Sequence, residues 1–174
     1  MPIVEMLENY AKQNNARFHM PCHKGVAQDF AYSNVFESVL PYDITELDFS
    51  DNLLNPDGVI DQAQKLYADL YGAEQCFFTT NGSTCGVLSM LASADGNILV
   101  ERGSHSSVFN GLSAFGKTAV VLNNHIKDGR FLPVTLRQIE IAVKENKNIK
   151  TVLLTSPNYY GETCDLQSIY AFCK

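Results

Sequence analysis

The sequence has few basic residues and no run of them. Its 174 residues include 13 Lys and Arg against 19 Asp and Glu, which gives a formal net charge of −6. Domains that bind nucleic acids carry a basic patch or stripe that neutralises phosphodiesters, so this composition argues against that class of partner. A small-molecule ligand is expected instead.

Long apolar segments are also missing. No apolar run approaches the roughly 18 residues that a membrane-spanning helix needs, and Glu5 and Glu8 stand where a secretory signal would have a basic flank and an apolar block. The five cysteines form no C-x-x-C pair and no repeated spacing, which favours reduced thiols over a disulfide framework. We therefore expect a cytoplasmic protein with no membrane partner.

Two kinds of ligand motif find little support as well. There is no G-x-G-x-x-G, and the turn Asn81-Gly82-Ser83-Thr84 has no Lys after its glycine, so it is not a Walker A loop. His19, Cys22 and His23 form the sequence His-Met-Pro-Cys-His, but no second, distant pair of ligands accompanies them, which makes a poor zinc site. The sequence therefore predicts no metal centre.

What is present, after residue 56, is a regular alternation of helix and strand patterns. Helical spacing occurs over 57–71, 83–94, 106–115 and 135–146, and short apolar runs typical of buried strands occur over 74–79, 97–100, 118–122 and 150–155. This order predicts an α/β fold with a mostly parallel sheet and flanking helices. Residues 123–129 are expected to form a loop, and 165–174 to begin a helix that is cut off before it is complete.

The first third of the chain does not share this alternation. A helix is expected over 3–13, and 17–56 has no regular pattern. We therefore expect residues 1–56 to form an N-terminal arm and cap, and residues 57–174 to form the main domain.

The most informative segment is the one in which a predicted strand, 76–78, runs into Thr79-Thr80-Asn81-Gly82-Ser83-Thr84 and then into a predicted helix. The start of a helix presents unpaired backbone N–H groups and the positive end of the helix dipole, which together favour a bound phosphate. The same residues also suit an ordinary helix cap. Taken alone, the segment leaves both interpretations open.

Two further candidates follow predicted strands, and ligands of parallel sheets bind at the carboxyl ends of strands. His105 follows the strand at 98–100, where it is either a surface or capping residue or an imidazole that stacks on a heteroaromatic ring. The turn at 156–161 follows the last predicted strand. Among the residues before the main domain, Asp43, Glu46, Asp48 and Asp51 form an acidic cluster that suits a cationic substrate and equally suits a solvated loop.

Six segments, in this order, resemble the Orn/Lys/Arg decarboxylases, which are pyridoxal-phosphate enzymes with the aspartate-aminotransferase-like fold. They are Arg17-Phe18-His19-Met20-Pro21-Cys22-His23-Lys24-Gly25, Asp43-Ile44-Thr45-Glu46, Asp51-Asn52-Leu53-Leu54, Thr80-Asn81-Gly82-Ser83-Thr84, His105-Ser106-Ser107 and Leu154-Thr155-Ser156-Pro157-Asn158-Tyr159-Tyr160-Gly161. Their order and spacing span nearly the whole chain. The resemblance implies that residues 57–174 are part of an aspartate-aminotransferase-like large domain, preceded by a helical arm, with pyridoxal 5′-phosphate as cofactor.

The resemblance also implies roles for individual residues. Gly82, Ser83 and Thr84 would hold the cofactor phosphate, and His105 would stack on the pyridine ring. Asn158 would lie at the edge of the cofactor. The substrate region would include His19, Asp43 and Glu46, and the substrate would be ornithine, lysine or arginine.

Two parts of the family pattern have no match in this sequence: the Asp that pairs with the pyridine nitrogen, and the Schiff-base Lys in a Ser-x-His-Lys context. Lys24, Lys117 and Lys127 do not occur in that context. We therefore expect the N-terminal portion of a longer decarboxylase that assembles at least as a dimer, with no activity in this chain alone. The alternatives are another pyridoxal-phosphate reaction, such as that of an aminotransferase or lyase, and a non-catalytic binding or assembly module.

Two residues depart from the family pattern within the matching segments. Cys22 stands where family members usually have Gly, and its Cβ would be costly if the backbone there required a positive φ. Ser106 stands where they usually have Lys, which removes a charge next to His105.

Overall fold

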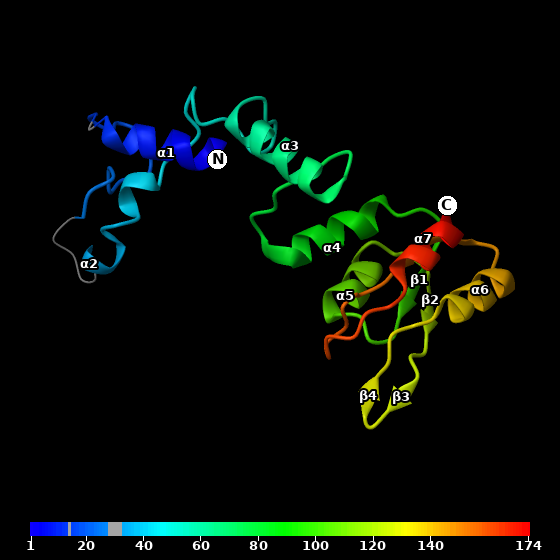
Figure 1. Cartoon of the computed structure of the whole chain (residues 1–174). Coiled ribbons are helices and arrows are strands. Elements are labelled where there is room, and N and C mark those ends of the chain that lie inside the picture. Colours follow the sequence, from blue (N-terminus) through cyan, green and yellow to red (C-terminus); the bar gives the residue numbers. More distant parts are fainter. Residues whose placement is uncertain (14, 28–32) are drawn as a thin grey trace. The chain divides into compact units, whose positions relative to one another are not determined.

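The computed structural model describes residues 1–13, 15–27 and 33–174. The chain forms two compact units, Met1–Phe78 and Thr79–Lys174 (Figure 1). The sequence placed a domain boundary at residue 56. In the structure the helix that follows this position, α3 (Val59–Tyr71), belongs to the first unit.

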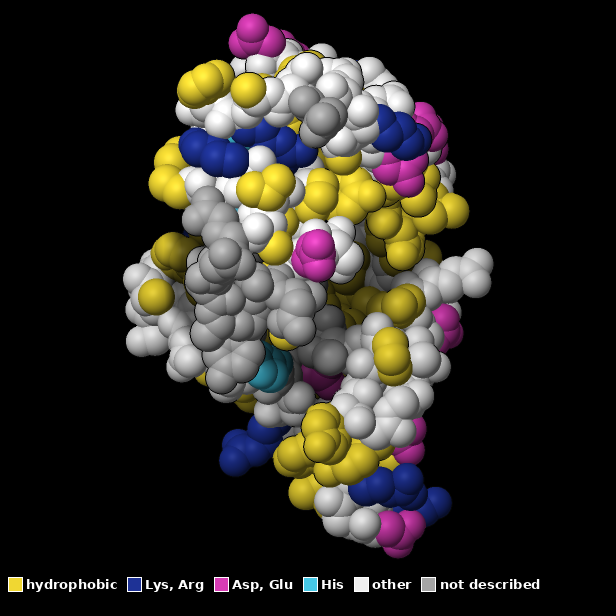
Figure 2. All heavy atoms as spheres, turned by 90° about the vertical axis from the view of Figure 1, so that its left-hand side faces the viewer, with side chains coloured by type: hydrophobic (Ala, Val, Ile, Leu, Met, Phe, Trp, Pro, Cys, Tyr) yellow, Lys and Arg dark blue, Asp and Glu magenta, His cyan; other side chains and the backbone are white. Residues whose placement is uncertain are grey.

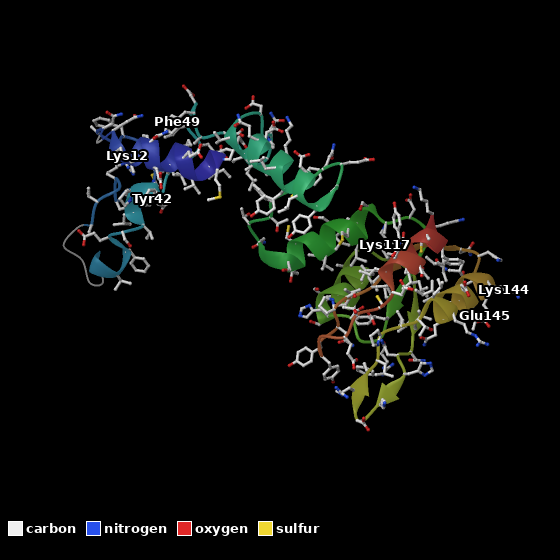
Figure 3. All side chains as sticks on the ribbon, in the orientation of Figure 1. Lys12, Tyr42, Phe49, Lys117, Lys144 and Glu145 are labelled. Atoms are coloured by element: carbon white, nitrogen blue, oxygen red, sulfur yellow. The ribbon has the colours of Figure 1, made fainter. Side chains whose placement is uncertain are left out.

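The first unit consists of helices and irregular segments. Its elements are α1 (Pro2–Lys12), α2 (Ser33–Phe36), the short 3-10 helix η1 (Leu40–Tyr42) and α3. Helix α1 packs against both α3 and η1, and the ring of Tyr10 lies 5.0 Å from that of Phe49 (labelled in Figure 3). The predicted helices at 3–13 and 57–71 are confirmed. Helix α3 ends at Gly72, whose φ of +62° is the left-handed conformation typical of a C-cap glycine.

The start of helix α3 is held by the carboxylate of Asp51, which lies 7 positions before its N-cap Gly58. Asp51 accepts hydrogen bonds from the backbone N–H groups of Gly58 at 2.8 Å and Ile60 at 2.9 Å, and those of Asn52, Asp57 and Asp61 point to it as well. Desolvation raises the pKa of Asp51, but these hydrogen bonds to the charged form outweigh it and hold the pKa well below its usual range. This member of the acidic cluster therefore organises the fold.

Large apolar side chains of the first unit reach the surface. The start of α1 and one face of α3 line an apolar groove of about 530 Å³, formed by Met1, Pro2, Ile3, Val4, Ala63, Leu66, Tyr67, Leu70 and Phe78. Leu66 is 55% exposed and Leu70 is 76% exposed. Hydrophobic side chains are likewise visible at many places on the surface in Figure 2. Much apolar surface is thus left available for packing against other protein.

The second unit is built on a parallel sheet of three strands in the order β2-β1-β5, formed by β1 (Asn97–Glu101), β2 (Ala119–Leu122) and β5 (Ile149–Leu153). The central strand β1 is buried on both faces. Ile98 and Val100 pack with residues of α4 (Gly82–Ser93) and α5 (Ser106–Ala114). Leu99 points to the opposite face, where it packs with residues of α6 (Leu136–Glu145) and α7 (Leu166–Cys173). The predicted α/β fold with a parallel sheet and flanking helices is confirmed.

Helices α4 and α5 pack closely because Gly111 lies at their contact. A Cβ at this position would lie 2.6 Å from Leu91 Cδ1 and 2.9 Å from Leu88 Cδ2. Beyond the end of α5, Lys117 (labelled in Figure 3) donates hydrogen bonds to the carbonyls of Ala92 and Ala94 at the end of α4. The carboxyl ends of the two helices therefore lie together.

Two sequence predictions are corrected by the structure. The strand predicted over 74–79 does not form, and Phe77 is 74% exposed. A strand needs a neighbour to pair its backbone N–H and C=O groups, and the three-stranded sheet does not include this segment, which joins the two units. The loop predicted over 123–129 contains one strand of a hairpin, β3 (Ile126–Lys127), which pairs with β4 (Arg130–Phe131) through an Asp128-Gly129 turn in which both φ angles are positive.

Candidate functional site

The first turn of α4 has an open amino end. Gly82 has a φ of +70°, and no atom lies within 4 Å of where its Cβ would be. Gly82, Ser83 and Thr84 are all exposed, and the preceding Asn81 makes no side-chain capping hydrogen bond. The other three helices of this unit have side-chain caps: His105 caps α5, Thr135 caps α6 and Asp165 caps α7. The amino end of α4 is therefore the one in this unit where an anion meets no competing side-chain cap.

His105 caps α5 with one of its two ring nitrogens. Its Nδ1 accepts a hydrogen bond from the backbone N–H of Ser107 at 3.2 Å and lies 2.9 Å from the Ser107 hydroxyl oxygen. Because a backbone N–H can only donate, Nδ1 is the acceptor and the proton of the neutral ring is on Nε2. The residue is exposed. Capping and ring stacking are thus compatible, since the cap uses the edge of the ring.

The carboxyl ends of the three strands are joined by a carboxylate that the sequence did not single out. Glu101, the last residue of β1, is 2% exposed. Its Oε1 accepts from the backbone N–H of Thr155, just after β5, at 2.7 Å. Its Oε2 accepts from Nδ2 of Asn124, just after β2, at 2.8 Å. The sequence contained one indication, a single acid that directly follows the apolar run 98–100.

Asn158 organises the turn after β5. Its Oδ1 accepts from the backbone N–H groups of Tyr160 and Glu162 at 2.9 and 3.0 Å, and its Nδ2 donates to the carbonyl of Phe131 at 3.0 Å. Gly161 closes the turn with a φ of +81°. Both ends of the Asn158 amide are engaged within the protein, and its position at the cofactor edge stays a prediction.

The residues predicted for the substrate region lie in the first unit, whereas the predicted cofactor residues lie in the second. His19 and Tyr10 share a hydrogen bond of 2.6 Å. Asp43 Oδ2 lies 3.1 Å from Nε2 of His23, and Glu46 accepts a hydrogen bond from the Asn52 side chain at 3.3 Å. The three residues thus have three different partners. In the described part of the chain, no group of three or more His, Cys, Asp or Glu side chains is placed to hold a metal ion.

Comparison with known proteins identifies the family. Residues 1–173 match the family described as "Orn/Lys/Arg decarboxylase, major domain". The chain belongs to this family. Among its relatives, the chain is 37% identical over 97% of its length to the Bacillus subtilis protein YaaO, described as uncharacterized, and 30% identical over 99% of its length to an arginine decarboxylase of Halalkalibacterium halodurans.

Solved structures of similar proteins agree with the fold of this decarboxylase family member. Lysine decarboxylase A from Pseudomonas aeruginosa superposes with a TM-score of 0.73 at 21% identity and covers 91% of this chain. The E. coli constitutive lysine decarboxylase gives 0.67 at 22% identity. The chain spans about a third of the length of the curated relatives, 36% in both cases above, and 24% and 25% of the two solved chains. Within the described residues, no helix is both long enough and apolar enough to cross a membrane.

The structure gives a partial account of the two departures from the decarboxylase pattern. In the segment around Cys22 the positive φ angles belong to Lys24, at +57°, and Gly25, at +79°. Cys22 itself is exposed and is not among the residues of positive φ, so its Cβ causes no backbone strain. Ser106 is the exposed first residue of α5, and nothing in the structure explains why Lys is replaced there.

Proposed function

We propose that this chain is the phosphate- and ring-binding portion of a pyridoxal-phosphate-dependent decarboxylase of a basic amino acid. The observation that carries the proposal is the exposed, uncapped first turn of α4, which coincides with the family segment Thr80–Thr84. The names of the relatives, which are arginine, ornithine and lysine decarboxylases, support the substrate class.

The residues present fit the cofactor. The backbone N–H groups at the start of α4 and the hydroxyls of Ser83 and Thr84 suit a phosphate, and the open space at Gly82 leaves room for it. The exposed ring of His105 offers a face for the pyridine, and Asn158 would stand at its edge. When bound, the cofactor accepts the electron pair that is released as CO₂ leaves. The role of this chain is to fix the phosphate and the plane of the ring, so that the bond to be broken is correctly oriented.

The proposal places the lysine that carries the cofactor outside these 174 residues. Lys24 donates to the His19 carbonyl at 2.6 Å, and Lys117 donates to carbonyls at the end of α4, so both have structural roles. Asp43 and Glu46 are the proposed carboxylates for the cationic substrate. The exposed apolar groove of the first unit supports assembly as a dimer or higher oligomer.

A binding experiment tests the cofactor part of this proposal. Pyridoxamine 5′-phosphate retains the ring and the phosphate, but its amine cannot form an imine with surface lysines. Titration calorimetry should detect its binding, and pyridoxamine without phosphate should bind at least about tenfold more weakly, because the charge-assisted hydrogen bonds are lost. Equal affinities for the two compounds would overturn the proposed phosphate site.

Substitutions locate the phosphate on α4. The double variant Ser83→Ala, Thr84→Val should weaken pyridoxamine 5′-phosphate binding by about tenfold, since it removes two hydroxyl donors. Ser93→Ala at the other end of α4 is the matched control, because its hydroxyl bonds only the Met90 carbonyl. Equal affinities for the double variant and the control would place the phosphate elsewhere.

The reaction is tested on the full product of the gene. We expect the reading frame to continue past Lys174 to a Ser-x-His-Lys segment, and the reconstituted protein to release labelled CO₂ from carboxyl-labelled arginine, lysine or ornithine. The 174-residue chain alone should release none. Transfer of the amino group with the carboxylate retained would indicate another pyridoxal-phosphate reaction and refute the decarboxylase assignment.

A further inference from the structure

We infer that Glu101 is a positioning residue for the proposed cofactor site, which it serves by fixing the two segments that carry His105 and Asn158. The inference rests on the proposed function, because it concerns the orientation of residues assigned to the cofactor. Glu101 is buried and lies at the end of the central strand. Its two oxygens join that strand to the segments that follow both neighbouring strands.

One arm of this arrangement leads to His105. Asn124 donates to Glu101 and to the carbonyl of Leu132 through Nδ2, and its Oδ1 accepts from the backbone N–H of Gly103 at 3.1 Å. Gly103 lies in the short turn that leads from β1 to His105. Glu101 therefore fixes the orientation of the Asn124 amide, and the amide in turn fixes the turn in front of the imidazole.

The other arm leads to Asn158. The backbone N–H of Thr155 donates to Glu101 Oε1 at 2.7 Å, directly before the turn that contains Asn158. This bond fixes where the chain leaves β5. The turn is then closed by the hydrogen bonds of the Asn158 side chain itself. The two segments that carry proposed ring contacts are thus held from a single side chain.

The geometry requires a side chain that accepts at both ends. The Thr155 partner is a backbone N–H, which can only donate. The Asn124 partner is its NH₂ group, because the Gly103 N–H identifies the other amide atom as the oxygen. A glutamine at 101 would have nearly the same shape, but its own NH₂ would face one of these two donors. Glu101→Gln therefore breaks one arm and leaves a buried donor without an acceptor.

The test compares two ligands on Glu101→Gln. Inorganic phosphate probes the first turn of α4, which Glu101 does not contact, and pyridoxamine 5′-phosphate also probes the ring contacts. We expect the phosphate affinity to stay within about twofold and the pyridoxamine 5′-phosphate affinity to fall about tenfold. A variant that was merely less stable would show no such selective loss, since both ligands bind the same folded unit.

Two further variants distinguish positioning from stability. Ile149→Val removes one methyl group from the buried amino end of β5. It should destabilise the second unit about as much as Glu101→Gln does, without weakening the binding of either ligand. Glu101→Gln combined with Asn124→Asp restores a donor–acceptor pair between the two side chains, although the Leu132 carbonyl loses its donor. This double variant should regain part of the lost pyridoxamine 5′-phosphate affinity. It can also be measured in place of Glu101→Gln if the single variant does not fold.

The possible outcomes separate the two proposals. If the unmodified chain binds no pyridoxamine 5′-phosphate, the proposed function fails and this inference fails with it. If the unmodified chain binds and Glu101→Gln binds with the same affinity, the proposed function stands and the positioning role of Glu101 is refuted. Equal losses for phosphate and pyridoxamine 5′-phosphate, or no recovery in the double variant, would also refute it.

Discussion

Replacing His105 by two different residues separates its two proposed roles. Its Nδ1 caps α5 by accepting from the Ser107 N–H, while the rest of the exposed ring is available to a cofactor. Asparagine is among the best N-cap residues and has no aromatic ring. His105→Asn should therefore keep the cap and lose the stacking surface, whereas His105→Ala should lose both.

The expected magnitudes follow from these contacts. Loss of an N-cap costs about 1 kcal/mol, so His105→Ala should lower the free energy of unfolding of the second unit by about that amount. His105→Asn should leave it within a few tenths of a kcal/mol. Stacking of aromatic rings contributes about 0.5–1.5 kcal/mol, so both variants should bind pyridoxamine 5′-phosphate about fivefold more weakly.

Two measurements on the same three proteins check this reasoning. Urea unfolding followed by circular dichroism gives the stability, and titration calorimetry with pyridoxamine 5′-phosphate gives the affinity. If His105→Asn binds as tightly as the unmodified chain, the ring of His105 does not contact the cofactor. If His105→Asn is as unstable as His105→Ala, the interpretation of Nδ1 as the cap is wrong.

Two other predictions concern stability. Gly96→Ala should destabilise the second unit by about 3 kcal/mol and Gly116→Ala by about 1 kcal/mol. Both glycines have φ near +60°, but only a Cβ at Gly96 would meet a backbone atom, because it would lie 2.7 Å from the carbonyl oxygen of Asn148. Equal urea midpoints for the two variants would refute the contribution of this clash. Folding lowers the pKa of Asp51, so the stabilisation by its carboxylate is complete above the unfolded pKa of about 4 and is lost as the pH falls below that value. The urea midpoint of Asp51→Asn should therefore depend less steeply on pH in the acidic range than that of the unmodified chain. An equally steep dependence would contradict the assignment to Asp51.

Hydrophobic periodicity was sufficient to predict most of the architecture. A strand buried on both faces must be apolar throughout, and a helix on a sheet must be apolar on one side, so the patterns at 97–100 and 135–146 could be interpreted without structural information. The same reasoning failed at 74–79, where an apolar run has no neighbouring strand to pair with. Periodicity reports where a side chain prefers to lie and does not reveal whether a partner strand is present.

The positions of candidate site residues were predictable where local geometry determines them. The position of His105 follows from the order strand, turn and helix, and α4 begins at the predicted turn although no strand precedes it. Glu101 escaped prediction because its partners are distant in sequence. The hydrogen bond from Thr155 to Glu101 spans 54 positions. A buried acid is costly without partners, so its importance becomes visible only once they are in place.

The strand order β2-β1-β5 also constrains how the second unit folds. Pairing of β1 with β2 closes a short loop, and Asn124, the first partner of Glu101, is 23 positions away. The second partner, Thr155, lies 54 positions away, beyond α6 and β5. Closing the longer loop has the larger entropic cost. On a growing chain, β1 and β2 can therefore associate before β5 is synthesised, and the carboxylate of Glu101 acquires its hydrogen bond from Thr155 only when β5 docks.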